Sequence, residues 1–187
     1  SQSAAAVRGK KDGEPLKTIF EYAEERGLST GIITSQSYHD ATPAACYAQV
    51  NDRRAAAKIL DGFLNPRFGD GVDVLVGAGR KQSLVASPDL LARAEKRNYR
   101  VLDSIGDLNG QTRAIAVVDG TFQLAPVMQK VIDILVRNKK GYILMVEWDA
   151  HTNAKNPKPG LDRVVEFDNA IRQTAQRRDI KNTLLLF

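Results

Sequence analysis

The amino-acid sequence predicts an α/β fold, a three-layer α/β/α sandwich with a mostly parallel sheet and helices on both faces. Two observations lead to this prediction. Apolar runs of about four to six residues alternate with helical patterns of about 10 to 14 residues, and no segment repeats at a fixed period. In addition, the 187 residues are 43% hydrophobic and 26% charged, which suits one domain with a core of its own.

Start and stop signals mark the predicted helices. Residues 1–14 are small, polar and glycine-containing, and we expect a loop there. Pro15 then opens a helix that ends at Gly27, while Thr42 as N-cap and Pro43 as first residue begin the next one. Further helices are predicted over residues 54–64, from Ser87 and Pro88 through Ala94, from Pro126 to Leu135, and over residues 161–171.

Six apolar runs are predicted as strands, at residues 29–34, 72–76, 100–102, 113–118, 142–146 and 183–187. The Gly77-Ala78-Gly79 stretch lacks the spacing of a nucleotide-binding loop, so we interpret it as a turn. In a parallel sheet the working groups collect at the carboxyl ends of the strands. The residues that follow each strand are therefore the first candidates for a site.

Charge and composition exclude several functions. The net charge is +5, but the basic residues are scattered and aromatic residues make up only 6%, so we expect no nucleic-acid binding. No apolar run approaches the roughly 20 residues that cross a bilayer, so we expect no membrane partner. The single cysteine, Cys46, cannot form a disulfide within the chain.

Two strand ends carry polar clusters. Asp40 and Thr42 follow the first strand, and their oxygens suit Mg²⁺, although both residues could simply cap the helix that follows. Glu147, Asp149, His151 and Asn153 follow the strand at 142–146. A carboxylate at the end of a buried strand has little structural use unless a positive group meets it, which indicates a metal or catalytic site.

Taken together, these segments resemble the alkaline phosphatase family. The resemblance rests on ordered blocks: residues 40–45 (DATPAA), 73–81 (DVLVGAGRK), 141–147 (GYILMVE) and 164–171 (VVEFDNAI). A first helix at residues 15–27 also fits, so the blocks span nearly the whole chain. The resemblance implies that residues 1–187 form the central portion of an alkaline-phosphatase-like catalytic domain, with no separate second domain.

The resemblance also implies roles for individual residues. Thr42 and Glu147 correspond to ligands of a Mg²⁺ ion, and Asp40 corresponds to a residue that approaches this ion, often through water. Arg53 lies eleven residues after Thr42, as does the phosphate-binding arginine of the family. A guanidinium fork can hold two phosphate oxygens. Without the family, Arg53 would be interpreted as a surface arginine at a helix end.

The zinc ligands are expected in the loop after Glu147. The family is expected to bind two Zn²⁺ ions and one Mg²⁺ ion. Asp149 corresponds to a zinc-binding aspartate if the loop is shortened by three residues, and Asn153 then stands where a histidine is expected. His151 could substitute for that histidine, since imidazole is the better zinc ligand, and the choice between His151 and Asn153 stays open.

The resemblance implies hydrolysis of phosphate monoesters through a phosphoserine. The nucleophilic serine is expected before residue 1 and the last zinc ligands after residue 187, so we assign no catalytic nucleophile within this chain and expect it to be inactive alone. Ser3 has no base or metal ligand beside it. The family further suggests a periplasmic or secreted protein and is compatible with a homodimer. The alternatives are a related metallo-phosphotransferase or sulfatase, and a non-catalytic binding domain on the same scaffold.

Overall fold

The computed structural model of the protein describes residues 15–152, 154–177 and 179–187. The loop expected over residues 1–14, Ser3 within it, and Asn153 lie outside these residues. The centre of the structure is a sheet of five parallel strands in the order β3-β4-β2-β1-β5. The strands are β1 (Ser29–Ser37), β2 (Val74–Ala78), β3 (Arg100–Leu102), β4 (Ala114–Val118) and β5 (Tyr142–Glu147).

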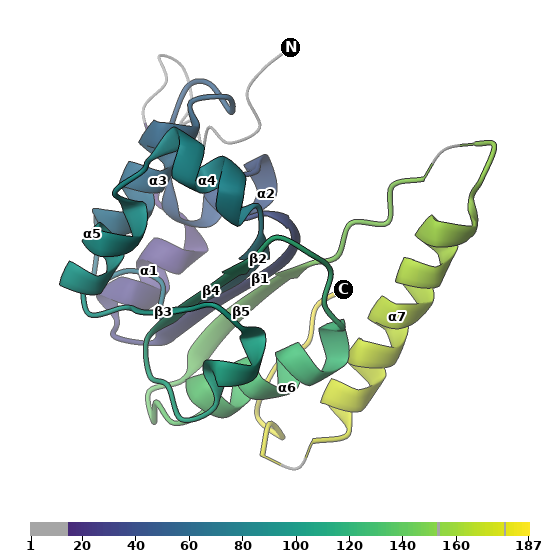
Figure 1. Ribbon diagram of the computed structural model, residues 1–187. Coiled ribbons are helices and arrows are strands. Elements are labelled where there is room, and N and C mark those ends of the chain that lie inside the picture. Colours follow the sequence, from purple (N-terminus) through teal and green to yellow (C-terminus); the bar gives the residue numbers. More distant parts are fainter. Residues whose placement is uncertain (1–14, 153, 178) are drawn as a thin grey trace.

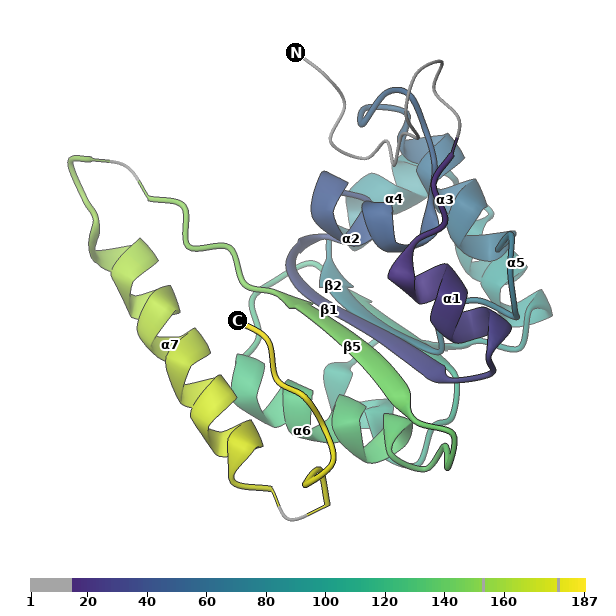
Figure 2. The same ribbon diagram turned by 180° about the vertical axis from the view of Figure 1, so that it is seen from behind.

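Helices cover both faces of the sheet, as predicted (Figure 1). One face carries α1 (Ile19–Glu25), α2 (Ala41–Tyr47), α3 (Ala56–Leu64), α4 (Arg80–Ala86) and α5 (Leu90–Lys96). The other carries α6 (Leu124–Leu135) and α7 (Lys158–Ala175), with a short 3₁₀ helix, η2 (Ile105–Leu108). Figure 2 shows α6 and α7 together on the side of the sheet away from α1. The prediction of a three-layer α/β/α fold is confirmed.

Each face of the sheet has its own apolar core because successive strand residues point to opposite sides. Ile33, Val74 and Val76 pack with α6 on one side. Ile32 and Leu75, their neighbours in the chain, pack with α1, α3 and α5 on the other. Continuous apolar runs such as VLV in β2 are therefore what a strand buried on both faces requires.

Two predicted helix starts were wrong. The first helix begins at Ile19 and not at Pro15, because Thr18 and Glu21 form a capping box in which each side chain accepts a backbone N–H of the other. The N-cap of α2 is Asp40 and not Thr42, since the Asp40 carboxylate accepts the N–H of Ala41. Proline is tolerated inside the first turn because the N–H groups there have no partner within the helix.

One α-helix was not predicted, and one predicted strand is absent. Gly79 has a φ of +85° and leads directly into α4, so the glycine stretch ends a strand and starts a helix. Residues 183–187 form no strand, and within the described structure β5 pairs only with β1. Leu184, Leu186 and Phe187 are exposed. An apolar run becomes a strand only when a neighbouring backbone supplies the ladder of hydrogen bonds.

The strand ends also differ from the prediction in a way that matters for the site. β1 continues to Ser37, beyond the predicted end at Thr34, and its pairing with β2 is irregular between Ile33 and Ser37. Such irregularities redirect side chains at the rim of a sheet. No helix among the described residues combines the length and the apolar character needed to cross a bilayer.

A buried carboxylate ties α1 to the amino end of the sheet. Glu24 accepts hydrogen bonds from the Thr30 hydroxyl and from the Gly71 N–H. Burial raises the pKa of Glu24 to about 7, with smaller contributions from the carboxylates of Asp73 and Asp70, while the hydrogen bonds oppose the rise. Near neutral pH this group is therefore only partly ionised.

This raised pKa makes a testable prediction about stability. Because the folded pKa of about 7 exceeds the ordinary value of 4.5, the folded protein holds a proton that the unfolded chain releases. The contribution of this bound proton to the free energy of unfolding is fully present below pH 4.5 and is lost as the pH rises through 7. Its full size is about 3 kcal/mol. We expect Glu24→Gln to remove this part of the fall in the free energy of unfolding, measured by urea denaturation between pH 5 and pH 8.

The matched control is Glu25→Gln, a half-exposed neighbour on α1 whose side chain pairs with Lys17. It should leave the fall of stability between pH 5 and pH 8 as it is in the wild type. An unchanged pH dependence in Glu24→Gln would contradict the assignment.

Candidate functional site

The candidate site lies at the carboxyl ends of β1 and β5. Thr34 stands directly opposite Glu147 in the parallel pairing of these strands. The Thr34 hydroxyl, fully buried, donates a hydrogen bond of 2.7 Å to Oε2 of Glu147. The end of the strand thus presents a half-buried carboxylate with its direction fixed, which is where the sequence predicted a metal or catalytic site.

The irregular end of β1 supplies the partners of Asp149. The N–H of Asp149 donates to Oγ of Ser35 at 2.8 Å, and the Gln36 amide donates to Oδ2 of Asp149. Arg163, from the second turn of α7, donates to the Asp149 carbonyl at 2.9 Å. Residue 149 is therefore held by two segments that are distant in sequence.

Asp149 and His151 form a pair. The Asp149 carboxylate accepts hydrogen bonds from the backbone N–H and from the ring of His151. Burial would raise the pKa of Asp149, but the two bonds from His151 and the positive charge of Arg163 outweigh it and lower this pKa below its usual range. The His151 side chain is otherwise open to solvent, with 96% of it exposed.

The second cluster lies at the start of α2. Asp40 caps the helix through the N–H of Ala41 and also forms an ion pair with Arg53. Thr42 is in the first turn and is exposed. The Arg53 side chain is 46% exposed, and Nη2 is the atom that contacts Asp40. The carboxylate of Asp40 therefore fixes the position of Arg53 at the rim of the sheet.

The charge of Glu147 acts on the thiol of Cys46, a residue of α2. Burial raises the pKa of Cys46 to about 12, and the negative charge of the Glu147 carboxylate raises it further in the same direction. The helix α2 also contacts β5, the strand that ends at Glu147. The two polar clusters therefore belong to one region of the molecule.

The structure brings some of the predicted residues together and not others. Glu147, Asp149 and His151 share one strand end, and Asp40 contacts Arg53. No hydrogen bond or ion pair between described residues joins Asp40 or Thr42 to Glu147. Within the described part of the chain there is also no group of three His, Cys, Asp or Glu side chains that could hold a metal ion.

Sequence reasoning missed the polar end of β1. Thr34, Ser35 and Gln36 contact Glu147 and Asp149 but were assigned no role. His39 was missed too; its ring contacts the hydroxyl of Ser37, and burial lowers its pKa. The sequence signal for a polar strand end was the run TSQS, residues 34–37, after an apolar strand. This run points to the site only once β1 is known to lie beside β5.

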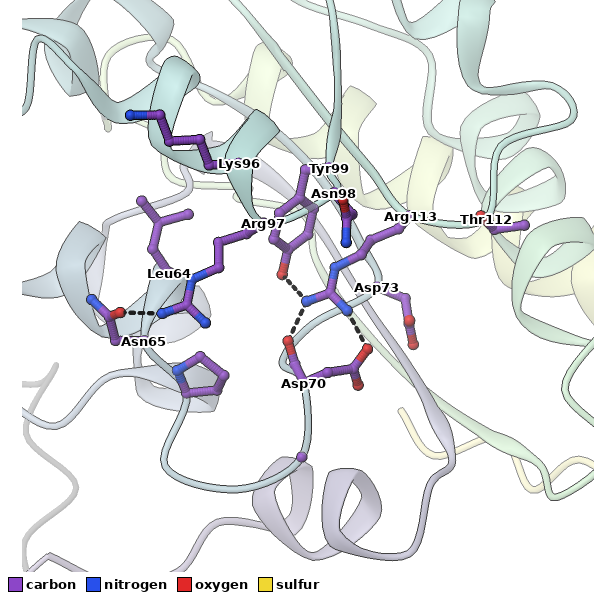
Figure 3. Close-up of a pocket in the computed structure, with 12 residues that line it drawn as sticks. Leu64, Asn65, Asp70, Asp73, Lys96, Arg97, Asn98, Tyr99, Thr112 and Arg113 are labelled. Carbon is purple, nitrogen blue, oxygen red and sulfur yellow. Dashed lines mark hydrogen bonds and ion pairs between the residues drawn. The ribbon is translucent and has the colours of Figure 1, made fainter.

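The structure has a larger cavity elsewhere, at the amino ends of the strands. It has a volume of about 720 Å³ and is bordered by Asp73, Tyr99 and Arg113, which precede β2, β3 and β4. Figure 3 shows contacts among the lining residues: Arg113 contacts Asp70 and the Tyr99 hydroxyl, and Arg97 contacts Asn65. We place the site at the opposite edge, because ligands of open α/β sheets bind at the carboxyl ends of the strands.

Comparisons with known proteins agree with this fold and place the chain in a family. The family model described as alkaline phosphatase matches residues 2–99, which is just over half of the chain. Alkaline phosphatase 4 of Bacillus subtilis is 26% identical over 97% of this chain and 44% of its own length.

Two solved structures resemble this one closely in fold. The cold-active alkaline phosphatase from the psychrophile Shewanella sp. has a TM-score of 0.73 and 26% identity, covering 91% of this chain and 45% of that one. A variant of the alkaline phosphatase from the Antarctic bacterium TAB5, with Mg bound, has a TM-score of 0.75 and 20% identity, covering 93% and 56%. The chain thus spans about half the length of these relatives, and by its family match, its sheet and its similarity to these proteins it belongs to the alkaline phosphatase family.

Proposed function

We propose that this chain supplies part of the metal and phosphate site of an enzyme that hydrolyses phosphate monoesters through a phosphoserine. The observation that carries the proposal is the Thr34–Glu147 pair at the carboxyl ends of two neighbouring strands, next to Asp149. Because the chain spans about half of its relatives, the activity is proposed for the whole protein. We also propose that the whole protein acts in the periplasm or is secreted, on the family resemblance alone.

The donor atoms at this edge fit a magnesium ion. Carboxylates and hydroxyls are the hard oxygen donors that Mg²⁺ prefers, and it typically takes one or two carboxylates together with water and phosphate. Among the described residues, the Glu147 carboxylate accepts a side-chain hydrogen bond only from Thr34, so it keeps lone pairs for a cation. We propose Glu147, Thr42 and Asp40 as the residues that hold Mg²⁺. The Mg-bound TAB5 variant, similar in fold, supports this choice of ion.

The described residues do not by themselves fit a zinc site. A catalytic zinc takes three protein ligands, and the structure offers the Asp149–His151 pair at this place. Two Zn²⁺ ions, held in part by Asp149 and by His151 or Asn153, remain an inference from the family resemblance.

Arg53 is proposed to bind the phosphate group. A guanidinium has five N–H donors, and the ion pair with Asp40 uses the Nη2 end. The remaining donors can hold non-bridging phosphate oxygens and offset the negative charge that these oxygens carry in the transition state. A bound divalent cation would supply further charge neutralisation. Asp40 then has a positioning role, since it fixes the guanidinium.

A non-catalytic binding domain is the second candidate. The observation that favours it is the lack of any group of three metal-binding side chains within the described ranges. The two candidates differ in metal content, because a phosphatase of this family would need bound metal for turnover and a binding domain would not.

Removal of the Glu147 charge should weaken magnesium binding. We expect Glu147→Gln to lower the affinity for Mg²⁺ at least about tenfold, and Thr34→Val to lower it by a smaller factor, because its hydroxyl only orients the carboxylate. Calorimetric titration of the chain with MgCl₂ measures both. Glu95→Gln, an exposed carboxylate on α5, is the control and should bind as the wild type does. An unaltered affinity of Glu147→Gln for Mg²⁺ would show that Glu147 is not a magnesium ligand.

Loss of Arg53 should weaken phosphate binding. Hydrogen bonds to charged groups contribute about 1.5–3 kcal/mol, so Arg53→Ala should raise the Kd for inorganic phosphate about 10- to 100-fold. The measurement is calorimetry in the presence of Mg²⁺ and Zn²⁺. Arg54→Ala is the matched control, because Arg54 is the next residue and pairs with Asp52. If both variants weaken phosphate binding equally, the effect comes from the lower positive charge of the protein and not from a contact of Arg53 with phosphate.

Turnover distinguishes the two candidate functions. With Zn²⁺ and Mg²⁺ we expect the whole protein to hydrolyse 4-nitrophenyl phosphate, and the 187-residue chain to show none because no residue in it is assigned as nucleophile. Strong turnover by the chain alone would contradict that assignment. Metal analysis accompanies the assay: a whole protein without bound metal and without turnover would favour the binding domain.

A further inference from the structure

A second cavity adjoins the candidate site. It has a volume of about 420 Å³, within the range of small-molecule sites, and its lining includes Ser35, Thr121, Phe122, Gln123, Trp148 and Arg163. These residues come from the end of β1, the segment before α6, the end of β5 and α7. Trp148 follows Glu147 directly, and both Trp148 and Phe122 pack against the core under α6. The cavity is therefore on the α6 side of the edge that carries Glu147.

Two aromatic rings form the apolar wall of this cavity. The ring centroids of Phe122 and Trp148 are 5.4 Å apart in an edge-to-face arrangement. The indole N–H of Trp148 donates to Oε2 of Glu166 at 3.2 Å, and Oε1 of Glu166 accepts the N–H of Leu124 at 3.0 Å. The polar atom of the indole and both oxygens of Glu166 are thus already bonded. What the wall offers to a ligand is aromatic surface.

Arg163 adds a positive charge to the lining of the cavity. Its guanidinium carbon is 5.9 Å from the centroid of the Trp148 ring, and its Nη1 donates to the Asp149 carbonyl at 2.9 Å. Arg163 forms no ion pair with any described carboxylate. A ring inserted beside Trp148 would therefore meet a second face that also attracts aromatic groups.

The cavity and the candidate site share their supports. Ser35 lines the cavity and accepts the N–H of Asp149, and Arg163 lines it and binds the carbonyl of the same residue. Trp148 stands between Glu147 and Asp149 in the chain. A phosphate group held beside Glu147 by a bound cation would leave the rest of its molecule near the ring of Trp148, the next residue in the chain.

We propose that this cavity receives an aromatic ring in the alcohol part of the phosphate monoester, so that Phe122, Trp148 and Arg163 select aromatic substrates over alkyl ones. This inference rests on the proposed function, because it assumes a phosphate group at the adjacent site. The aromatic selectivity of the cavity itself can be tested without turnover.

The chain contains one tryptophan, and it lies in the cavity, so its fluorescence reports binding directly. We would titrate the 187-residue chain, with Mg²⁺ present, with benzylphosphonate, ethylphosphonate and benzyl alcohol. The phosphonates keep a stable C–P bond and cannot turn over. We expect saturable changes with benzylphosphonate and with benzyl alcohol, the former binding more tightly, and an affinity for ethylphosphonate at least about fivefold weaker than for benzylphosphonate.

Variants that keep Trp148, and with it the fluorescence signal, test whether Phe122 contacts the ligand. Phe122→Ala should weaken benzylphosphonate about fivefold and leave ethylphosphonate within about twofold. The control is Tyr22→Ala, which removes a half-exposed aromatic ring from α1 on the other face and should bind as the wild type does. Circular dichroism checks folding, and if Phe122→Ala does not fold, Phe122→Leu keeps the apolar volume and removes the aromatic ring.

The outcomes separate this inference from the proposed function. Equal affinity for benzyl- and ethylphosphonate, or wild-type affinity for benzylphosphonate in a folded Phe122 variant, would overturn the aromatic subsite. Benzyl alcohol that binds as tightly as benzylphosphonate would support the aromatic subsite and contradict the phosphate site beside it.

Discussion

The parallel pairing of β1 with β5 is the constraint on which the rest of the site depends. It places Thr34 opposite Glu147 at the last register position, where the sheet meets solvent. A carboxylate so close to an apolar strand is tolerated because a hydroxyl donates to it. The same pairing brings Ser35 and Gln36 to Asp149, so a single register decides the positions of both carboxylates.

Strand alternation then divides this edge into two environments. Glu147 is held by Thr34 and acts on the thiol of Cys46 in α2, whereas the next residue, Trp148, packs under α6. Adjacent residues of the chain therefore face a polar region and an aromatic cavity. Arg163 joins the two, because it contacts the ring of Trp148 and the backbone of Asp149.

The amino edge of the sheet has a structural role that complements the carboxyl edge. Thr30 donates its hydroxyl to Glu24 and its N–H to Asp73, and burial raises the pKa of both carboxylates. Arg113 contacts Asp70 and the ring of Tyr99 beside them. These contacts hold α1 and the loops before β2 and β4 together at this edge of the sheet.

The sequence by itself determined the alternation of helices and strands, the parallel sheet and the carboxylates at strand ends, because apolar periodicity and local start signals act over a few residues. Through the family resemblance it also predicts roles for Glu147, Asp149 and Arg53. Only the tertiary structure decided that residues 183–187 form no strand and that Thr34, Ser35 and Gln36 face the site. Both depend on which strand lies beside which, and that is settled by backbone hydrogen bonds between residues more than a hundred positions apart.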